Sequence, residues 1–225
     1  GGLGLILSLP VTTRQGINHE VSAYRIPAYV KKIDFLHRHY RYQALARQLT
    51  GGLSDERKRV EAVYRWTREH IRPTPAGWPI VDDHVLDIII RGYGVGDQVA
   101  DVFTTLCTYA GVPAFWRPLR IQAGTGWLIL SFARVDGRWA MFDVGSNVIF
   151  ADAQGNWLDA AELVENPTLQ AAIAGLKTPE GVVYQRYLDH LQPFRVPTIL
   201  RAQKQMPWPR LLFEVRRALH LVPRD

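Results

Sequence analysis

The stretch from residue 92 to residue 113, GYGVGDQVADVFTTLCTYAGVP, places a glycine-rich turn directly before an apolar helix. The apolar side chains recur at the spacing of one broad helix face: Val99, Val102, Phe103, Leu106, Cys107 and Ala110. A stripe this wide has to face a core. Asp97 is the expected N-cap, Gly111 suits a left-handed C-terminal cap, and Pro113 ends the helix. Enzymes place nucleophiles and anion sites at such turns, because free N–H groups and the helix dipole favour negative charge there.

A family resemblance lies in the same stretch. Gly94-Val95-Gly96, the helix and the Gly-Val-Pro-Ala turn that follows it form a pattern similar to the active-site segment of the transglutaminase-like (papain-like cysteine) superfamily. In that family the position of Gly96 holds the nucleophilic cysteine. The residue that the family's chemistry needs is therefore replaced by glycine.

The resemblance continues through a hairpin and spans roughly residues 55–150. Asp136-Gly137 and Trp139 match the family's hairpin, and Asp143 matches its aspartate. Counting back from Trp139 places the family's histidine position at Leu128, or at Trp127 with a one-residue slip. Neither side chain can move a proton. The resemblance thus implies a degenerate member that keeps Asp143 but lacks the catalytic cysteine and histidine.

The fold that the resemblance implies is α+β, with a helical half packed against a small antiparallel sheet and helices and a basic tail at the C-terminal end. We expect one domain over residues 1–192 and a proline-rich basic tail over 193–225, with an amphipathic helix over 211–221. The basic residues of the tail that could contact an anionic surface are Arg195, Arg201, Lys204, Arg210, Arg216 and Arg217.

The residues themselves predict the same order of helices and strands. Helices are expected over 31–49, with Ile33, Leu36, Tyr40 and Ala44 facing inward, and from Ser54 to residue 72. Strands are expected over 114–120, 127–135, 138–143 and 148–150, with Asp136-Gly137 as a two-residue hairpin turn. Helices return at Asn166-Pro167 and over 180–191.

Composition bounds the function only loosely. With 225 residues, 47% hydrophobic and 21% charged, the chain suits one soluble globule. The net charge of +6 permits weak attraction to polyanions without indicating a specific nucleic acid. Leu3 to Pro10 is apolar but too short to span a bilayer, which takes about 20 residues, and a cytoplasmic protein is expected. The basic and aromatic face of helix 31–49 (His37, Arg38, His39, Arg41, Tyr42) is either a polyanion-binding face or, more in keeping with charge blocks, a solvated one.

Metal and phosphate sites are weakly indicated. Asp82, Asp83 and His84, with His37 and His39, offer metal-binding side chains but no defined ligand spacing. The glycines at 92, 94 and 96 do not fit a phosphate loop, because the third glycine of that motif would fall at Asp97. No cofactor is expected.

Cysteine chemistry has no complete set of groups in this sequence. Cysteine–histidine acyl transfer needs a thiolate, a base and an orienting carboxylate. Cys107 lies on the apolar stripe, about 16 Å of helix rise from Gly96, and is expected to be a core residue. Asp143 without an imidazole to orient is expected to be structural.

Three functional hypotheses follow. The first is an inactive binding or scaffolding module that takes a peptide, a glycan or a protein partner in the remnant cleft. Its expected lining is Gly94, Gly96, Asp97, Gln98, Trp127, Leu128, Asp143 and His84. The second is a hydrolase or transferase that uses Asp143, Asp97 and His84. The third is a structural protein that recruits partners through its basic tail.

Overall fold

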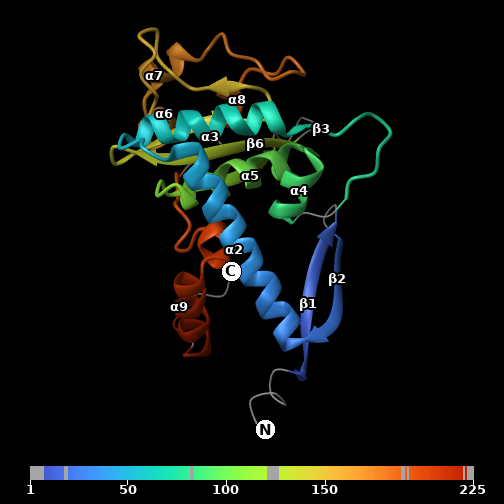
Figure 1. Ribbon diagram of the computed structural model, residues 1–225. Helices are drawn as coiled ribbons and strands as arrows, with labels where there is room; N and C mark the ends of the chain where they lie inside the picture. The colour runs from blue at the N-terminus through green and yellow to red at the C-terminus, as the bar shows by residue number, and fades with distance from the viewer. Residues whose placement is uncertain are drawn as a thin grey trace.

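The computed structural model describes residues 8–17, 20–81, 84–120, 127–188, 191, 193–219 and 221. Its helices and strands follow one another as a hairpin, a helical half, a sheet and a set of short helices (Figure 1). They are β1 (Pro10–Ile17), β2 (Glu20–Pro27), α2 (Ala28–Thr50), α3 (Glu56–His70), β3 (Arg72–Pro73), α4 (Val85–Arg91), β4 (Tyr93–Gly94), α5 (Gly96–Tyr109), β5 (Ala114–Arg120), β6 (Trp127–Val135), β7 (Arg138–Asp143), β8 (Val148–Ile149), α6 (Ala160–Glu165), α7 (Pro167–Ala172), α8 (Gln185–Leu188), η2 (Arg201–Gln205) and α9 (Pro207–Ala218).

The helix α5 is the centre of the fold. Its residues from Gln98 to Thr108 are all buried, polar ones included. The helices α2, α3 and α4 pack around it, and the strands β5 and β6 cover another side. Gly111 has a φ of +83°, the left-handed conformation expected for a residue that ends a helix. Burial on all sides makes α5 the fixed element against which the others are positioned.

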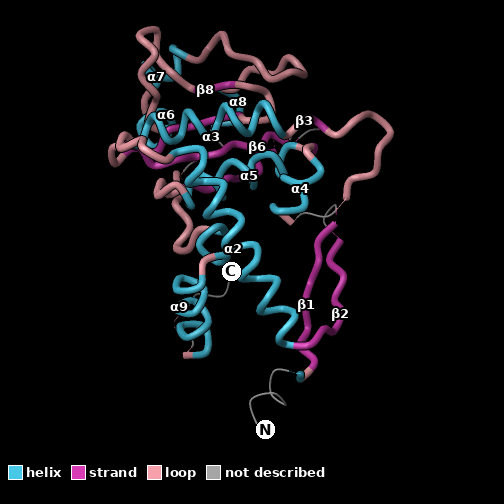
Figure 2. The backbone as a smooth tube through the Cα atoms, in the orientation of Figure 1, coloured by secondary structure: helices cyan, strands magenta, loops and turns pink. Residues whose placement is uncertain are grey.

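A four-stranded antiparallel sheet lies against α5, in the order β5-β6-β7-β8 (Figure 2). The predicted hairpin turn is confirmed: Asp136 and Gly137 both have positive φ, at 50° and 80°, as a tight turn between twisted strands requires. One face of the sheet packs on α5 through Ala133 and Phe142. The other face contributes Leu130 and Phe132 to a second apolar cluster with the C-terminal segments. The expected α+β architecture is confirmed.

The start of α5 differs from the expectation. Asp97 is not the N-cap; the N-cap is Val95, and Gly96 is already the first helical residue. The reason is the side chain of Gln98, whose Oε1 accepts the Val95 N–H at 3.2 Å and fixes the first turn earlier. The carboxylate of Asp97 instead accepts the N–H of Gln98 at 3.0 Å.

The predicted inward face of α2 is wrong. Ile33, Leu36 and Tyr40 are exposed by 63%, 42% and 61%, and Ala44 is exposed as well. The buried positions are Tyr42, Ala46 and Thr50, on another face of the helix. Regular apolar spacing predicts a buried helix face. Here, however, the first half of α2 extends past the body of the domain, and no element of the described chain covers its apolar face.

Polar contacts explain why the other face of α2 is the inner one. The ring of His39 contacts the hydroxyl of Tyr109 at 3.0 Å, and the hydroxyl of Tyr42 accepts the Leu86 N–H at 3.0 Å. Arg38 reaches His84 at 2.9 Å. Of the basic and aromatic residues that suggested a solvated or polyanion-binding face, Arg38, His39 and Tyr42 therefore attach the helix to its own domain. The other two, His37 and Arg41, are exposed and contact each other.

Other differences concern short elements. The β1–β2 hairpin and the parallel pair β3–β4 were not predicted. The helix expected over 180–191 is regular only over Gln185–Leu188, although Tyr184, Tyr187, Leu188 and Leu191 are buried as expected. Asp82 and Asp83 lie outside the described residues. No helix in the described part of the chain combines the length and the apolarity that crossing a bilayer requires.

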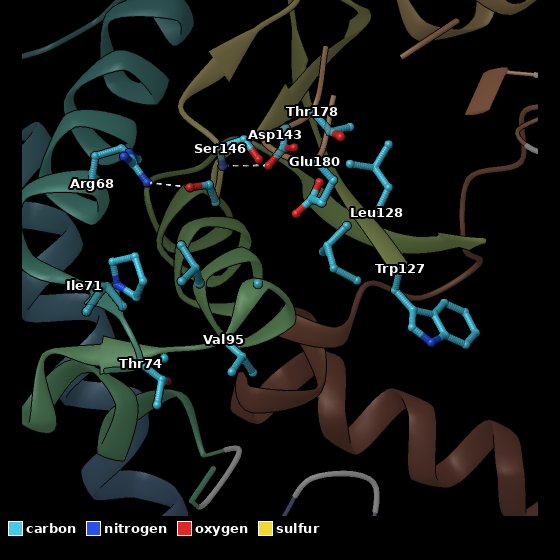
Figure 3. Close-up of a pocket in the computed structure, with 16 residues that line it drawn as sticks. Arg68, Ile71, Thr74, Val95, Trp127, Leu128, Asp143, Ser146, Thr178 and Glu180 are labelled. Carbon is cyan, nitrogen blue, oxygen red and sulfur yellow. Dashed lines mark hydrogen bonds between the residues drawn. The ribbon is translucent and has the colours of Figure 1, made fainter. Parts of the chain in front are cut away.

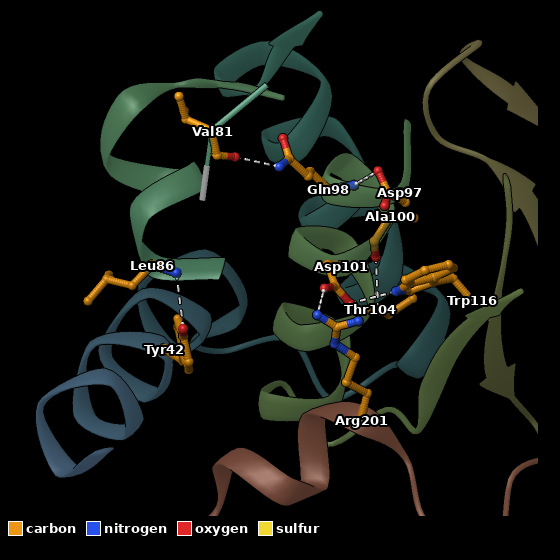
Figure 4. A network of polar contacts seen from close by, with 10 residues as sticks. All are labelled: Tyr42, Val81, Leu86, Asp97, Gln98, Ala100, Asp101, Thr104, Trp116 and Arg201. Atoms are coloured by element: carbon orange, nitrogen blue, oxygen red, sulfur yellow. Dashed lines mark hydrogen bonds and ion pairs between the residues drawn. The ribbon is translucent and has the colours of Figure 1, made fainter. Parts of the chain in front are cut away.

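The segment after residue 192 docks on the domain through η2. Leu200 and Ala202 are buried, and Arg201 Nη2 lies 2.8 Å from the buried carboxylate of Asp101 (Figure 4). The indole N–H of Trp116 donates to the other oxygen of the same carboxylate at 2.5 Å. The segment is thus joined to the centre of the fold by an ion pair between the half-exposed Arg201 and the buried Asp101, while α9 projects beyond it.

We predict that Asp101→Ala lowers the free energy of unfolding by about 2 kcal/mol, because it leaves the Trp116 indole and Arg201 without their shared acceptor. The matched control is Arg210→Ala, which breaks an exposed pair with Glu214 on α9; its cost should stay below about 0.5 kcal/mol. Urea unfolding of both variants measures the difference. Equal losses of unfolding free energy in the two variants would contradict the stabilising role that we assign to the Asp101 carboxylate.

Candidate functional site

A cavity of about 330 Å³ opens beside the N-terminus of α5 (Figure 3). Its walls come from α3, the β3–β4 pair, the start of α5, the strand β6, the turn after β7 and the loop before α8. The lining residues are Arg68, Ile71, Pro73, Thr74, Gly94, Val95, Gly96, Val99, Trp127, Leu128, Ile129, Asp143, Gly145, Ser146, Thr178 and Glu180. The volume is within the usual range of small-ligand pockets.

The three positions singled out by sequence all line this cavity. Gly96 is at the first turn of α5, Leu128 is on β6, and Asp143 is the last residue of β7. Trp127, the alternative to Leu128, also lines it and is 62% exposed at its mouth. The fold thus brings Gly96, Leu128 and Asp143, from three separate elements, to one cavity.

The space beside Gly96 is open enough for a side chain. A Cβ built on Gly96 would meet only Ile129 Cγ1, at 3.6 Å, which is an ordinary van der Waals contact. A Cβ built on Gly145 would lie 4.0 Å from the Gly96 Cα. Glycine at 96 is therefore not required by packing, and the cavity extends into the place where a cysteine side chain would stand.

Asp143 is buried and held by two hydrogen bonds. Its Oδ1 accepts the backbone N–H of Ser146 at 2.9 Å, and its Oδ2 accepts the hydroxyl of Tyr184 at 2.7 Å. Burial, followed by the charge of Asp143, raises the pKa of Tyr184 well above its ordinary value, so the phenol stays a donor. The carboxylate thus links the end of β7 to the C-terminal half of the chain, which is the structural role expected for it.

The turn after β7 is attached to α3. Arg68 Nη1 donates to the carbonyl oxygens of Val144 at 3.0 Å and Gly145 at 2.8 Å. The hydroxyl of Tyr64 donates to Asn147 Oδ1 at 3.2 Å, and burial raises the pKa of Tyr64 to about 12. These contacts hold one wall of the cavity in place, since they fix the turn from the side opposite Asp143.

Three residues that sequence analysis expected in the lining do not reach it. Gln98 is buried, with its Oε1 accepting from Arg91 at 2.8 Å and its Nε2 donating to the Val81 carbonyl at 2.9 Å (Figure 4). His84 contacts Arg38 on α2. The carboxylate of Asp97 accepts the N–H of Gln98 within the first turn of α5. Gly94, which does line the cavity, is needed as glycine, because a Cβ there would lie 3.0 Å from the Cβ of Gln98.

Other lining residues were not identified from the sequence. Ile129 is the residue that faces Gly96, one position beyond the expected histidine slot, because alternation along β6 turns it toward α5. Glu180, expected to begin a helix, and Thr178 both come from the loop before α8, and Figure 3 places both beside Asp143. No sequence pattern near Arg68 indicated that it lines the cavity, because its side chain contacts a turn 76 residues further along the chain.

The lining, as far as the described residues form it, offers carboxylates, hydroxyls, a guanidinium, an indole and backbone groups, but neither a thiol nor an imidazole. Cys107 is fully buried in the core, and burial raises the pKa of its thiol well above the usual value. Among the described residues no group of three His, Cys, Asp or Glu side chains is arranged to hold a metal ion. Hydrogen bonding and apolar contact are the interactions that this lining can supply.

Comparisons with known proteins agree with the fold. Residues 43–127 match the sequence model of the transglutaminase-like superfamily, which confirms the resemblance for that segment. The segment includes Gly96 and ends at Trp127, ahead of Leu128 and Asp143. No curated protein matches the chain.

Two solved structures are similar to part of the chain. A "Putative Cysteine Protease" from Cytophaga hutchinsonii has 19% identity and a TM-score of 0.41 over 56% of this chain and 44% of its own. A "Putative Protease" from Parabacteroides distasonis ATCC 8503 has 13% identity and a TM-score of 0.38 over 59% of this chain and 35% of its own. The chain spans less than half the length of either protein.

We predict that Gly96→Cys folds and reacts with iodoacetamide in the native state, because the new side chain enters the cavity at a helix N-terminus, where a thiolate is favoured. The unsubstituted chain, whose single thiol is in the core, should react only after denaturation. Mass spectrometry of the labelled proteins measures both. Native labelling of Cys107, or an unreactive thiol in the folded variant, would contradict the described geometry.

We predict that Tyr184→Phe lowers the free energy of unfolding by about 1–3 kcal/mol at neutral pH, because one oxygen of the buried Asp143 loses its donor. A phenol whose pKa is raised in the folded state stabilises the fold fully below the pKa that it has in the unfolded chain, near 10. This stabilisation is lost as the pH rises further. The difference in unfolding free energy between the unsubstituted protein and Tyr184→Phe should therefore narrow above pH 10. Urea unfolding across this pH range tests it, with the exposed Tyr29→Phe as the control. A gap that widens with pH would overturn the assignment.

Proposed function

We propose that this transglutaminase-like fold serves as a non-catalytic binding module that takes a segment of peptide in the cavity beside Gly96. The observation that carries the proposal is the composition of the lining. By the resemblance, Gly96 and Leu128 stand where the family's chemistry uses sulfur and imidazole, and both line an open cavity. A pocket that keeps its shape without reactive groups is suited to holding a ligand rather than cleaving it.

A peptide fits this lining better than a glycan. The part of the lining around the start of α5 is aliphatic, with Ile71, Val95, Val99 and Ile129 among its residues. Sugars favour several planar polar side chains, whereas an apolar side chain of an extended peptide gains from such a surface at about 25 cal/mol per Å² of buried area. Exposed Trp127 adds a flat ring at the mouth on which a peptide can lie.

The acidic end of the cavity favours a basic or neutral ligand. Glu180 is exposed and faces the cavity near Asp143. Each oxygen of Asp143 already accepts a hydrogen bond, from Ser146 or Tyr184, whereas Glu180 is exposed, so Glu180 is the carboxylate we assign to a ligand amine or guanidinium. We therefore propose a peptide that places an apolar side chain near Ile129 and a basic one near Glu180.

The alternative is a hydrolase or transferase that uses Asp143, Asp97 and His84. The positions of two of these residues argue against it, because His84 and Asp97 lie outside the cavity lining. His84 contacts Arg38, and Asp97 accepts an N–H in the first turn of α5. General acid–base work needs both partners within hydrogen-bond reach of one substrate. Turnover of an amide or ester library that is lost in Asp143→Asn would favour this alternative.

We predict that Gly96→Leu weakens peptide binding at least tenfold, because the new side chain fills the cavity from its inner end. The matched control is Gly175→Leu, at a position where an added Cβ meets nothing within 4 Å and the backbone is unstrained. Calorimetry against a peptide library and a glycan library, with product analysis of each mixture, provides the measurement. Glycan binding alone, or peptide binding that survives Gly96→Leu, would contradict the proposal.

A further inference from the structure

An exposed apolar surface lies apart from the cavity, on elements that project to one side of the domain. In Figure 1 the β1–β2 hairpin, the first half of α2 and the helix α9 all extend the same way from the body. Most of the large hydrophobic side chains that are exposed in the described chain belong to these elements or adjoin them. They are Leu9, Val21, Tyr24, Tyr29, Val30, Ile33, Leu36, Tyr40, Trp208, Leu211, Leu212, Val215, Leu219 and Leu221.

The helix α9 carries the sharpest part of this surface. Trp208, Leu211, Leu212 and Val215 recur at the spacing of one helix face, and Trp208 is 76% exposed. The opposite side turns toward its own domain: Lys204 of η2 lies over the Phe213 ring at 4.8 Å. The apolar stripe of α9 therefore points away from the protein. Packing within the domain does not explain why these side chains are apolar.

The projecting part of α2 repeats the pattern. Tyr29, Ile33, Leu36 and Tyr40 are spaced by four, three and four residues, which places them on one exposed helix face. Two separate helices of one domain thus present apolar stripes that nothing in the described chain covers. A shared external surface would explain both.

Positive charge accompanies the apolar stripes. On α9, Arg210, Arg216 and Arg217 stand against Glu214 alone, and Glu214 already contacts two of the three. On α2, Lys32 adjoins Ile33, and the one acid nearby, Asp34, is paired with Arg38. The same sign of charge on both helices opposes a symmetric contact with a second copy and favours an anionic surface.

We propose that this apolar and basic surface, made by α9 and the first half of α2, docks on an anionic lipid surface. At about 1.5 Å per residue α9 is about 18 Å long, so it lies in the plane of the membrane interface instead of crossing it. Trp208 and the leucines enter the headgroup region, and Arg216, one helical turn from Leu212, contacts lipid phosphates.

Vesicle sedimentation of the full chain tests the proposal. Vesicles of phosphatidylcholine with about one third phosphatidylserine should bind the protein, and pure phosphatidylcholine should bind it far more weakly, since each basic residue near an anionic surface contributes. Raising the salt concentration should weaken the binding to the mixed vesicles through screening. Equal binding to both vesicle types, or none to either, would overturn the proposal.

Substitutions at exposed positions separate the surface from folding. Leu212→Glu and Ile33→Glu should each lower vesicle partitioning about tenfold, which corresponds to one lost apolar side chain. Arg216→Ala should lower it about fivefold. The matched control is Ile90→Glu, because Ile90 is 74% exposed on α4, outside this surface. An equal loss in Ile90→Glu, or concentration-dependent dimers that Leu212→Glu abolishes without any vesicle binding, would show that lipid is not the occupant.

Discussion

The burial of α5 is the constraint on which the rest of the structure depends. The helix is enclosed along its length, so its start cannot shift without disturbing the helices and the sheet packed around it. The side chain of Gln98 closes the first turn onto Val95 and joins it to Arg91 and Val81. A backbone position is thus held rigidly at the edge of a cavity, and the rigidity comes from the core rather than from the residues that a ligand would touch.

The cavity follows from this arrangement and from the attachment of the facing turn. Asp143 and Arg68 hold the turn after β7 from opposite sides, through Ser146 and Tyr184 on one and through backbone carbonyls on the other. Because these contacts are complete within the protein, the carboxylate needs no histidine partner to remain buried. The turn after β7 therefore keeps its position through contacts within the protein, and the cavity keeps its wall.

Sequence periodicity was sufficient for the parts of the fold that local patterns determine. The stripe of α5, the three long strands and the Asp136-Gly137 turn all lie where their patterns placed them, because each combines burial with a local backbone preference. The positions Gly96, Leu128 and Asp143 also meet, since one family pattern spans the helix and the hairpin.

Long-range contacts were beyond the reach of the same reasoning. The stripe of Ile33 and Tyr40 is as regular as that of α5, yet it remains exposed, because hydrophobic spacing does not reveal whether another element reaches that face. Glu180 enters the cavity from a loop far along the chain. Asp97 and His84 were predicted to line the site because they lie close to Gly96 in the sequence. In the fold, Asp97 contacts the N–H of Gln98 and His84 contacts Arg38.

Backbone amide NMR during titration with a bound peptide, combined with product analysis of the same sample, tests the central claim most directly. The account predicts saturable shifts at Gly96, Ile129 and Gly145, which surround the cavity, and an unchanged peptide after long incubation. Shifts confined to other regions, or a cleaved or transferred peptide, would contradict it.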